Sequence, residues 1–323
     1  MAKRALLIGV SRYESGLLED LPGCVLDVAE MQRVLSRHAN ANQDKNFDCR
    51  ILTSANGAPP VSRVTLRKKL QDTFDAYEDE ILIYFSGHGL LDYSGGFIVA
   101  EDGVPGDPGI PMMEIHQMAH KSKAKTITII LDCCNAGSFG QSTGGDVSMR
   151  DGMTILGSSR GDQASQMTAG GGSVFTSLMV GGLEGGAANL RGHVTTASIY
   201  AYVDASLGEW GQRPIYKSYA KRVEPLRLCE PLCPDPIIRE IVNVFAGPES
   251  TYTLTPKHEE TEAGHDPEKV ALFQTIKRLQ IAGLVRPSDP NQHHLYWVAL
   301  ESGDVRLTEL GKFYYHLVLK NEI

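Results

Sequence analysis

The sequence predicts an α/β protein with a largely parallel central sheet, and three observations support this prediction. Four short runs are apolar almost without interruption, as in strands that are covered on both faces. Amphipathic helical patterns separate these runs, so strand and helix alternate along the first part of the chain. The 323 residues are 42% hydrophobic and 22% charged, which is ordinary for a globular domain with a sizeable core.

The expected elements follow one another in chain order. The four strands are Arg4–Val10, Phe47–Thr53, Glu80–Ser86 and Thr126–Asp132. Helices are expected over residues 24–38, over residues 62–77 with Ser62 as the cap, near 175–183 and near 196–207. The runs "MTILGSS" and "RPIYKS" supply later strands.

Charge and cysteine content narrow the classes of protein. The net charge of −8 favours neither nucleic acid nor an anionic membrane as a partner. No apolar run approaches the roughly 18 residues of a membrane span, and the first residues do not resemble a signal peptide. Six scattered cysteines do not form a disulfide framework, so we expect a cytoplasmic protein with free thiols.

The last third of the chain has a different character. We expect a first domain over 1–225, a linker and irregular segment over 226–265, and a winged-helix-like α+β domain over 266–323. Residues 226–323 hold 14 Asp and Glu against 10 Lys and Arg, which is little positive charge for gripping DNA. The tail is therefore predicted to be a protein-docking regulatory domain, with a DNA-binding regulator as the alternative.

Two expected strands end in residues that carry chemistry. "SGHG" places His88 after the third strand, and "DCCNAG" places Cys134 after the fourth, 46 residues later. If the strands are neighbours, both side chains lie at one edge of the sheet and can form a cysteine–histidine dyad. Cys133 is expected to be a buried spacer.

These motifs resemble those of the caspase and metacaspase family of cysteine peptidases, over roughly residues 3–220. The pair Asp132 and Cys134 is closer to the Asp-x-Cys of metacaspases and bacterial caspase-like peptidases than to the Gln-x-Cys of caspases. The resemblance implies a three-layer sandwich with a mostly parallel six-stranded sheet. It also implies that Cys134 is the nucleophile, that His88 is the acid–base, and that the N–H groups of Gly89 and Cys134 form the oxyanion hole.

The resemblance also implies a specificity. The metacaspase pocket for the residue before the cut is acidic, and its positions match Cys24, Asp27, Ser86 and Asp132 here, with Asp162 as a further candidate. Two carboxylates would bind Arg or Lys by charge-assisted hydrogen bonds. The expected partners are protein substrates with Arg or Lys before the cut, together with an upstream activating protein or protease.

Regulation is predicted more coarsely. No cofactor or metal is expected, because Asp92, Glu101, Asp102 and Asp107 are spaced differently from the calcium cluster of metacaspases. Arg150 is a candidate processing site, and Lys221–Arg222 is a second one. Bacterial relatives suggest a role in defence or regulated cell death.

Four alternatives remain open on the sequence alone. "GSSRG" would make Ser159 a serine nucleophile, but a loop-like segment follows it instead of a helix. Cys229 and Cys233 with His258 or His265 would bind zinc, in a spacing that fits known sites poorly. The last two are a catalytically silent signalling module and the DNA-binding tail.

Overall fold

The protein is represented by a computed structural model that divides into two compact units. The first unit comprises Met1–Ala188 and His193–Glu230, and the second comprises Asn189–Gly192 and Pro231–Ile323. The structure describes residues 2–16, 18–55, 57–139, 141–142, 145–146, 148–158, 171–207, 213–220 and 224–323. Within these ranges, no helix is both long and apolar enough to cross a membrane.

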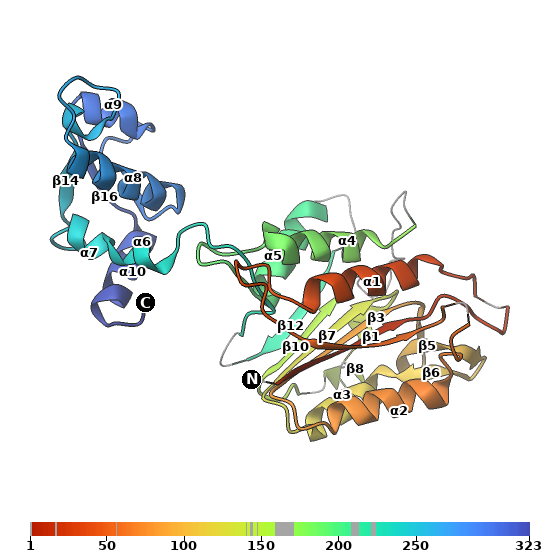
Figure 1. Ribbon diagram of the computed structural model, residues 1–323. Coiled ribbons are helices and arrows are strands. Elements are labelled where there is room, and N and C mark those ends of the chain that lie inside the picture. The colour runs from red at the N-terminus through yellow and green to blue at the C-terminus, as the bar shows by residue number, and fades with distance from the viewer. Residues whose placement is uncertain are drawn as a thin grey trace. The chain divides into compact units, whose positions relative to one another are not determined.

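A six-stranded sheet runs through the first unit in the order β12-β10-β7-β3-β1-β2 (Figure 1). All neighbouring strands are parallel except β12, which pairs antiparallel with β10. The strands are β1 (Lys3–Gly9), β2 (Asp48–Thr53), β3 (Glu80–Ser86), β7 (Thr126–Asp132), β10 (Met153–Gly157) and β12 (Ile215–Tyr219). The predicted mostly parallel six-stranded sheet is confirmed.

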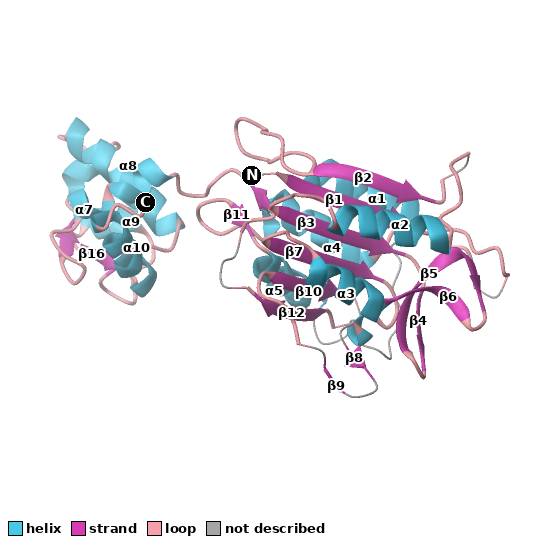
Figure 2. Ribbon diagram, turned by 90° about the horizontal axis from the view of Figure 1, so that it is seen from below, coloured by secondary structure: helices cyan, strands magenta, loops and turns pink. Residues whose placement is uncertain are grey.

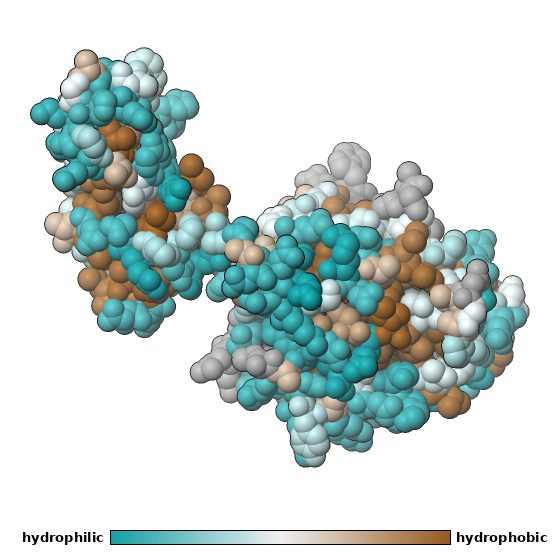
Figure 3. Space-filling model, in the orientation of Figure 1, coloured by the Kyte–Doolittle hydropathy of each residue, from teal (hydrophilic) through white to brown (hydrophobic). Residues whose placement is uncertain are grey.

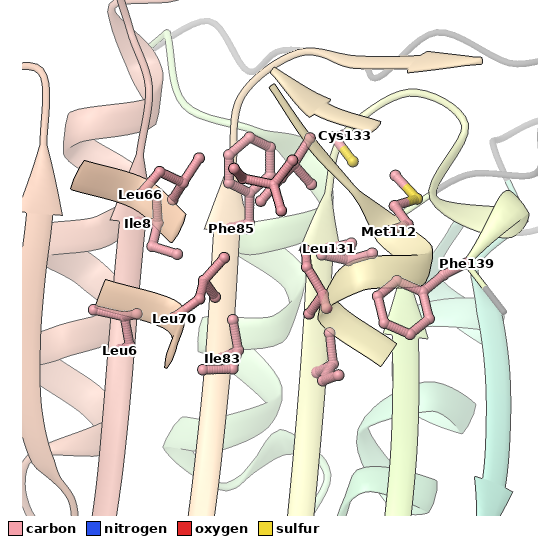
Figure 4. Close-up of a cluster of buried hydrophobic side chains, with 14 of the residues drawn as sticks. Leu6, Ile8, Leu66, Leu70, Ile83, Phe85, Met112, Leu131, Cys133 and Phe139 are labelled. Atoms are coloured by element: carbon pink, nitrogen blue, oxygen red, sulfur yellow. The ribbon is translucent and has the colours of Figure 1, made fainter. Parts of the chain in front are cut away.

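Helices cover both faces of this sheet and complete the three layers (Figures 1 and 2). On one face lie α1 (Gly23–Leu35), α4 (Val174–Gly181) and α5 (Thr196–Leu207), and on the other lie α2 (Arg63–Phe74) and α3 (Met112–Lys121). Alternate strand residues enter the two cores, so Leu7 and Tyr84 pack towards α1 and α4, while Ile8 and Phe85 pack towards α2. Figure 4 shows the second of these cores, which includes Leu66 and Leu70 of α2.

Three short antiparallel strands follow β3 and were not predicted from the sequence. They are β4 (Gly89–Asp92), β5 (Gly95–Val104) and β6 (Asp107–Pro111), in the order β4-β5-β6. Gly95 and Gly106 have positive φ angles of 130° and 84°, which allow the two tight reversals between the strands. This small sheet packs against α2 and α3, so it lies on that side of the main sheet.

The first unit is completed by short elements. These are β8 (Gln141–Ser142), β9 (Gly145–Asp146), β11 (His193–Val194), β13 (Arg227–Leu228) and the helical turns Ala136–Ser138 and Gly182–Gly186.

The second unit corrects the expected domain boundaries. Residues 226–265 are not an irregular linker, because they form β13, α6 (Asp235–Arg239), α7 (Ile241–Val244), β14 (Thr251–Thr253) and the turn Pro256–His258. Ile238, Ile241, Phe245 and Leu254 are buried in the core of the second unit. The proline-rich composition is typical of a linker and gives no local sign of these short elements. Their apolar residues are buried only because the later helices pack against them.

The later part of the second unit also differs from a winged helix. Residues 295–300 form the helix α9 (Leu295–Leu300) where a winged helix would have the first strand of its wing, and β16 (Asp304–Leu307) pairs with β14 and β15 (Val285–Pro287). The expected helix before it is α8 (Pro267–Ile281), capped by Asp266, and the last helix is α10 (Glu309–Leu319). A winged-helix assignment is therefore not confirmed.

Candidate active site

The two strands that were expected to carry the dyad are neighbours in the sheet. In the parallel pairing of β3 and β7, Ser86 lies opposite Asp132, and the Gly87 N–H donates to the Asp132 carbonyl over 3.3 Å. His88 and Cys134 each follow this pair by two residues. The register therefore brings both turns to the same edge of the sheet, as the sequence predicted.

The turn after β3 lies directly on the turn after β7. A Cβ atom added to Gly89 would stand 2.0 Å from the Cys134 carbonyl oxygen and 3.0 Å from Cys133 Sγ. Asn135, with a left-handed φ of 60°, turns the chain away after Cys134. Only glycine at position 89 allows this close approach.

The His88 ring is held in one orientation by backbone and aromatic contacts. Its Nε2 lies 2.9 Å from the Glu19 carbonyl oxygen, and since a carbonyl only accepts, Nε2 carries the hydrogen. The Nδ1 atom of the neutral ring is then a proton acceptor. The Tyr13 ring lies 4.7 Å from the imidazole, and the Tyr13 hydroxyl accepts the His88 backbone N–H over 2.8 Å.

Two backbone N–H groups at this edge are free to meet a substrate oxygen. The Val99 N–H donates to the His88 carbonyl over 3.0 Å, so Gly89 and Ile98 form a non-hydrogen-bonded pair. In that geometry the Gly89 N–H points away from β5. Among the described residues, the N–H of Cys134 also has no hydrogen-bond partner.

The two adjacent cysteines differ in environment. Cys133 is fully buried and points into the core beside Met112 (Figure 4). Burial raises the pKa of its thiol well above the usual value, which disfavours the thiolate. Cys134 is only half-buried, so solvent reaches it more easily than Cys133; that Cys134 is the reactive thiol stays a prediction.

A carboxylate pocket lies on the α1 and α4 side of this edge. Asp27, on α1, is buried and accepts hydrogen bonds from the Ser86 hydroxyl (2.9 Å) and from the Ser173 backbone N–H (3.0 Å). Burial raises the pKa of Asp27. The pocket thus joins α1, the end of β3 and the start of α4.

Asp132 supplies the second carboxylate from the end of β7. It is 3% exposed, and its Oδ2 accepts the Thr176 hydroxyl over 2.6 Å. Burial raises its pKa to about 6; the Asp27 charge adds to the rise, and the nearby hydroxyls of Ser173 and Thr176 oppose it. Its Oδ1 atom is buried without a well-formed hydrogen bond in the described part of the chain.

No cation neutralises this pair within the described residues. None of the ion pairs there includes Asp27 or Asp132. Burial also raises the pKa of the Cys24 thiol to about 12, so Cys24 is uncharged near neutral pH. Two buried carboxylates therefore lie near each other without a neutralising cation in the described part of the chain.

One wall of the pocket is set by two glycines in contact. A Cβ atom on Gly23, the first residue of α1, would stand 1.8 Å from the Gly171 carbonyl oxygen. The segment that leads to Ser173 therefore rests on the backbone of α1, and this contact holds the Ser173 N–H over Asp27.

The remaining candidate residues either lie away from the two carboxylates or are not among the residues that the structure describes. The Arg150 guanidinium donates to the carbonyls of Ala119 (3.2 Å), Ser122 (2.7 Å) and Ala124 (2.5 Å), so its side chain is engaged. Four candidate residues lie outside the described residues: Ser159, Asp162, Lys221 and Arg222.

The acidic residues after β3 have partners of their own, and no calcium cluster forms from them. Glu101 bonds the Ser54 hydroxyl and the Val61 N–H and pairs with Arg12, while Asp102 and Asp107 pair with Arg63. No three His, Cys, Asp or Glu side chains converge as a metal site within the described ranges.

The candidate zinc ligands do not form a group of three or more metal-binding side chains among the described residues either. The Cys229 thiol donates to the Leu183 carbonyl in the first unit, whereas Cys233 is buried in the core of the second unit. His258 bonds Tyr252 and Thr255.

Sequence reasoning missed the residues that orient the site. Tyr13, Glu19, Ser173 and Thr176 contact the candidate residues from segments without a motif of their own. The one local signal was "SVFT", in which Ser173 caps α4 by accepting the Thr176 N–H.

The sheet, the helical layers and the adjoining cysteine and histidine turns define a caspase-like α/β protein. The family model of the caspase domain matches residues 2–223, and the chain belongs to this family of cysteine peptidases. Among solved structures it is similar to caspase-1 from Spodoptera frugiperda, with a TM-score of 0.53 and 14% sequence identity. That match covers 70% of this chain and 90% of the caspase-1 chain, and it supports the fold alone. No curated protein matches the chain by sequence.

Proposed function

We propose that this caspase-family peptidase is an endopeptidase that uses a Cys134–His88 dyad and cleaves proteins after Arg or Lys. The Cys134 thiol gives its proton to His88 Nδ1, and the sulfur attacks the carbonyl carbon of the scissile bond. The N–H groups of Gly89 and Cys134 stabilise the oxyanion, and His88 returns the proton to the leaving amine. Water then hydrolyses the thioester.

The orientation of His88 supports this assignment. Because Nε2 donates to Glu19, the ring presents a basic Nδ1 without needing a carboxylate partner. The close contact of Gly89 with the Cys134 carbonyl sets two free N–H groups at one edge. A thiol at position 134, a base at position 88 and two N–H donors are the kinds of group that acyl transfer requires.

The specificity rests on one observation, the unneutralised pair of buried carboxylates formed by Asp27 and Asp132. An incoming arginine or lysine side chain supplies the missing positive charge and bonds the open Oδ1 of Asp132. A substrate aspartate would add a third negative charge to a desolvated site. The same pair that costs stability in the empty enzyme would therefore select the substrate.

Aminocoumarin peptides that differ only in the last residue, Arg, Lys or Asp, test both parts of the proposal. The wild type should release coumarin after Arg and Lys, and Cys134→Ala and His88→Ala should lose nearly all of this activity. Cys133→Ala is the matched control and should stay active. An inactive Cys133→Ala beside an active Cys134→Ala, or efficient cleavage after Asp, would refute the proposal.

We also propose that the second unit is a regulatory domain that binds protein. The side chains of Trp297 and Phe313 are 49% and 58% exposed. Exposed aromatic side chains are enriched at surfaces that bind other proteins. Deleting residues 231–323 should leave the coumarin assay unchanged and alter its regulation. Tight duplex DNA binding that weakens steeply with salt would favour the DNA-binding alternative instead.

Processing and biological role stay predictions. With its side chain on three carbonyls, Arg150 would need local opening before cleavage, so an uncut Arg150→Ala protein should be fully active. A cytoplasmic enzyme in defence or cell death follows only from the family resemblance.

A further inference from the structure

We propose that a cavity beside His88 binds an apolar side chain of the substrate on the leaving-group side of the scissile bond. The cavity lies between the loop after β1 and the small sheet β4-β5-β6, and its volume is about 300 Å³. This inference rests on the proposed peptidase function and adds a second specificity to it.

Three residues that line the cavity come from segments that contact or adjoin His88. Leu18 precedes Glu19, whose carbonyl holds the His88 ring. Leu90 lies two residues beyond His88 on β4, and Val99 of β5 donates its N–H to the His88 carbonyl over 3.0 Å. The cavity therefore lies close to His88, although His88 itself does not line it.

The walls of the cavity are mainly apolar. Phe97, Val104 and Pro108 join the leucines of the loop and of β4. Leu91 and Val104 are 52% and 45% exposed, so their side chains are not needed by the core. Figure 3 shows hydrophobic residues at the surface of the right-hand end of the larger unit, where Figure 1 places β5 and β6.

The one charged lining residue is already engaged. Asp92 Oδ1 accepts the backbone N–H and the hydroxyl of Ser94, as in a capped turn. An uncharged aliphatic or aromatic side chain therefore matches the cavity better than a charged one. A volume near 300 Å³ is at the lower end for ligand pockets and suits one such side chain.

The position relative to the dyad decides which side of the substrate enters. The carboxylate pocket, which takes the residue before the cut, lies on the α1 and α4 side of the main sheet. The small sheet lies on the opposite side, against α2 and α3 (Figure 2). Since His88 protonates the leaving amine, the chain beyond the cut passes His88 and reaches this cavity.

Two classes of substrate separate this cavity from the rest of the site. Peptidyl-Arg methyl esters release only methanol, which is too small to fill the cavity, whereas internally quenched peptides share the same residues up to Arg and continue with Gly or Leu. The wild type should prefer Leu to Gly after the cut by roughly tenfold in kcat/KM, as for other apolar pockets. Leu91→Ser should remove most of this preference and leave the turnover of the methyl ester unchanged.

Tyr93→Ser is the matched control. Tyr93 lies in the same hairpin and is 92% exposed, but it does not line the cavity, so this variant should keep the preference. Partition of the acyl-enzyme gives an independent readout. Added leucinamide or glycinamide attacks the thioester carbonyl, the C–S bond breaks, and the amine proton returns to the sulfur through His88. Leucinamide should compete with water several-fold better than glycinamide.

The outcomes distinguish this inference from the proposed function. Equal kcat/KM for Gly and Leu peptides in an enzyme that is active on the coumarin substrate would overturn the cavity assignment alone. So would a Leu91→Ser variant that slows both substrate classes equally. Absence of Cys134-dependent coumarin release would overturn the proposed function and this inference together.

Discussion

Replacing Asp132 by asparagine should stabilise the fold while it weakens the binding of basic substrates. Asp132 is 3% exposed, and burial raises the pKa of its carboxyl from near 4 to about 6. A rise of this size means that ionising the side chain costs the folded state about 3 kcal/mol. The asparagine amide keeps an acceptor oxygen for the Thr176 hydroxyl and carries no charge.

The sign of the pH dependence follows from the direction of this shift. A carboxyl whose pKa is higher in the folded state contributes stability below its unfolded pKa, and that stability is lost as pH rises through about 6. The Asp132→Asn variant lacks this loss. Its advantage over the wild type should therefore grow by about 1.5 kcal/mol between pH 5 and pH 8.

Urea unfolding at pH 5 and pH 8, followed by circular dichroism, measures this difference. The exposed residue Asp75, at the end of α2, gives the control Asp75→Asn, which should show no such growth. In parallel, the inhibition constant of benzamidine, a small aromatic amidine cation, should rise for Asp132→Asn. A variant that is destabilised equally at both pH values, or one that binds benzamidine as the wild type does, would refute the reasoning.

Three further substitutions have defined expectations. Gly89→Ala should abolish coumarin release with the protein still folded, because its Cβ would displace the Cys134 carbonyl; normal turnover would contradict the contact. Tyr13→Phe should cost about 1 kcal/mol in urea unfolding, because the part-buried His88 N–H loses its acceptor, and an unchanged midpoint would argue against that bond. Thr176→Val removes the shortest hydrogen bond to the Asp132 carboxylate, which should raise the pKa of Asp132. The fall of kcat/KM for Arg peptides at low pH should then occur at a higher pH. An unchanged pH profile would show that Asp132 does not cause this fall.

The main sheet was predictable because its signals are local. The runs Glu80–Ser86 and Thr126–Asp132 match β3 and β7 in the structure, since a strand buried on both faces is apolar throughout. The pairing of His88 with Cys134 also followed from strand ends in a parallel sheet.

The small sheet, α9 and the contact that orients His88 depend on interactions between distant residues, which no short sequence pattern predicts. In β5, Gly103 interrupts the apolar pattern, and Gly95 and Gly106 reverse the chain at short intervals, so the sequence gives no clear signal for the small sheet. The "YWVAL" segment of α9 is rich in β-formers, and only packing of Leu295 and Val298 into the second core makes it helical. The acceptor for His88 Nε2 is the backbone carbonyl of Glu19, and since every residue has such a carbonyl, the sequence does not indicate which one orients the ring.

The direct backbone contact between Gly23 and Gly171 suggests how a temperature-sensitive variant of this protein can be made. Neither residue would touch the substrate, yet a methyl group at position 23 must move the segment that caps Asp27. Gly23→Ala should thus leave Cys134 and His88 in place and weaken the binding of the substrate side chain. This loss should become larger at higher temperature. For a geneticist, this position offers a temperature-sensitive protease whose thiol still reacts with an alkylating probe while its cellular targets go uncut.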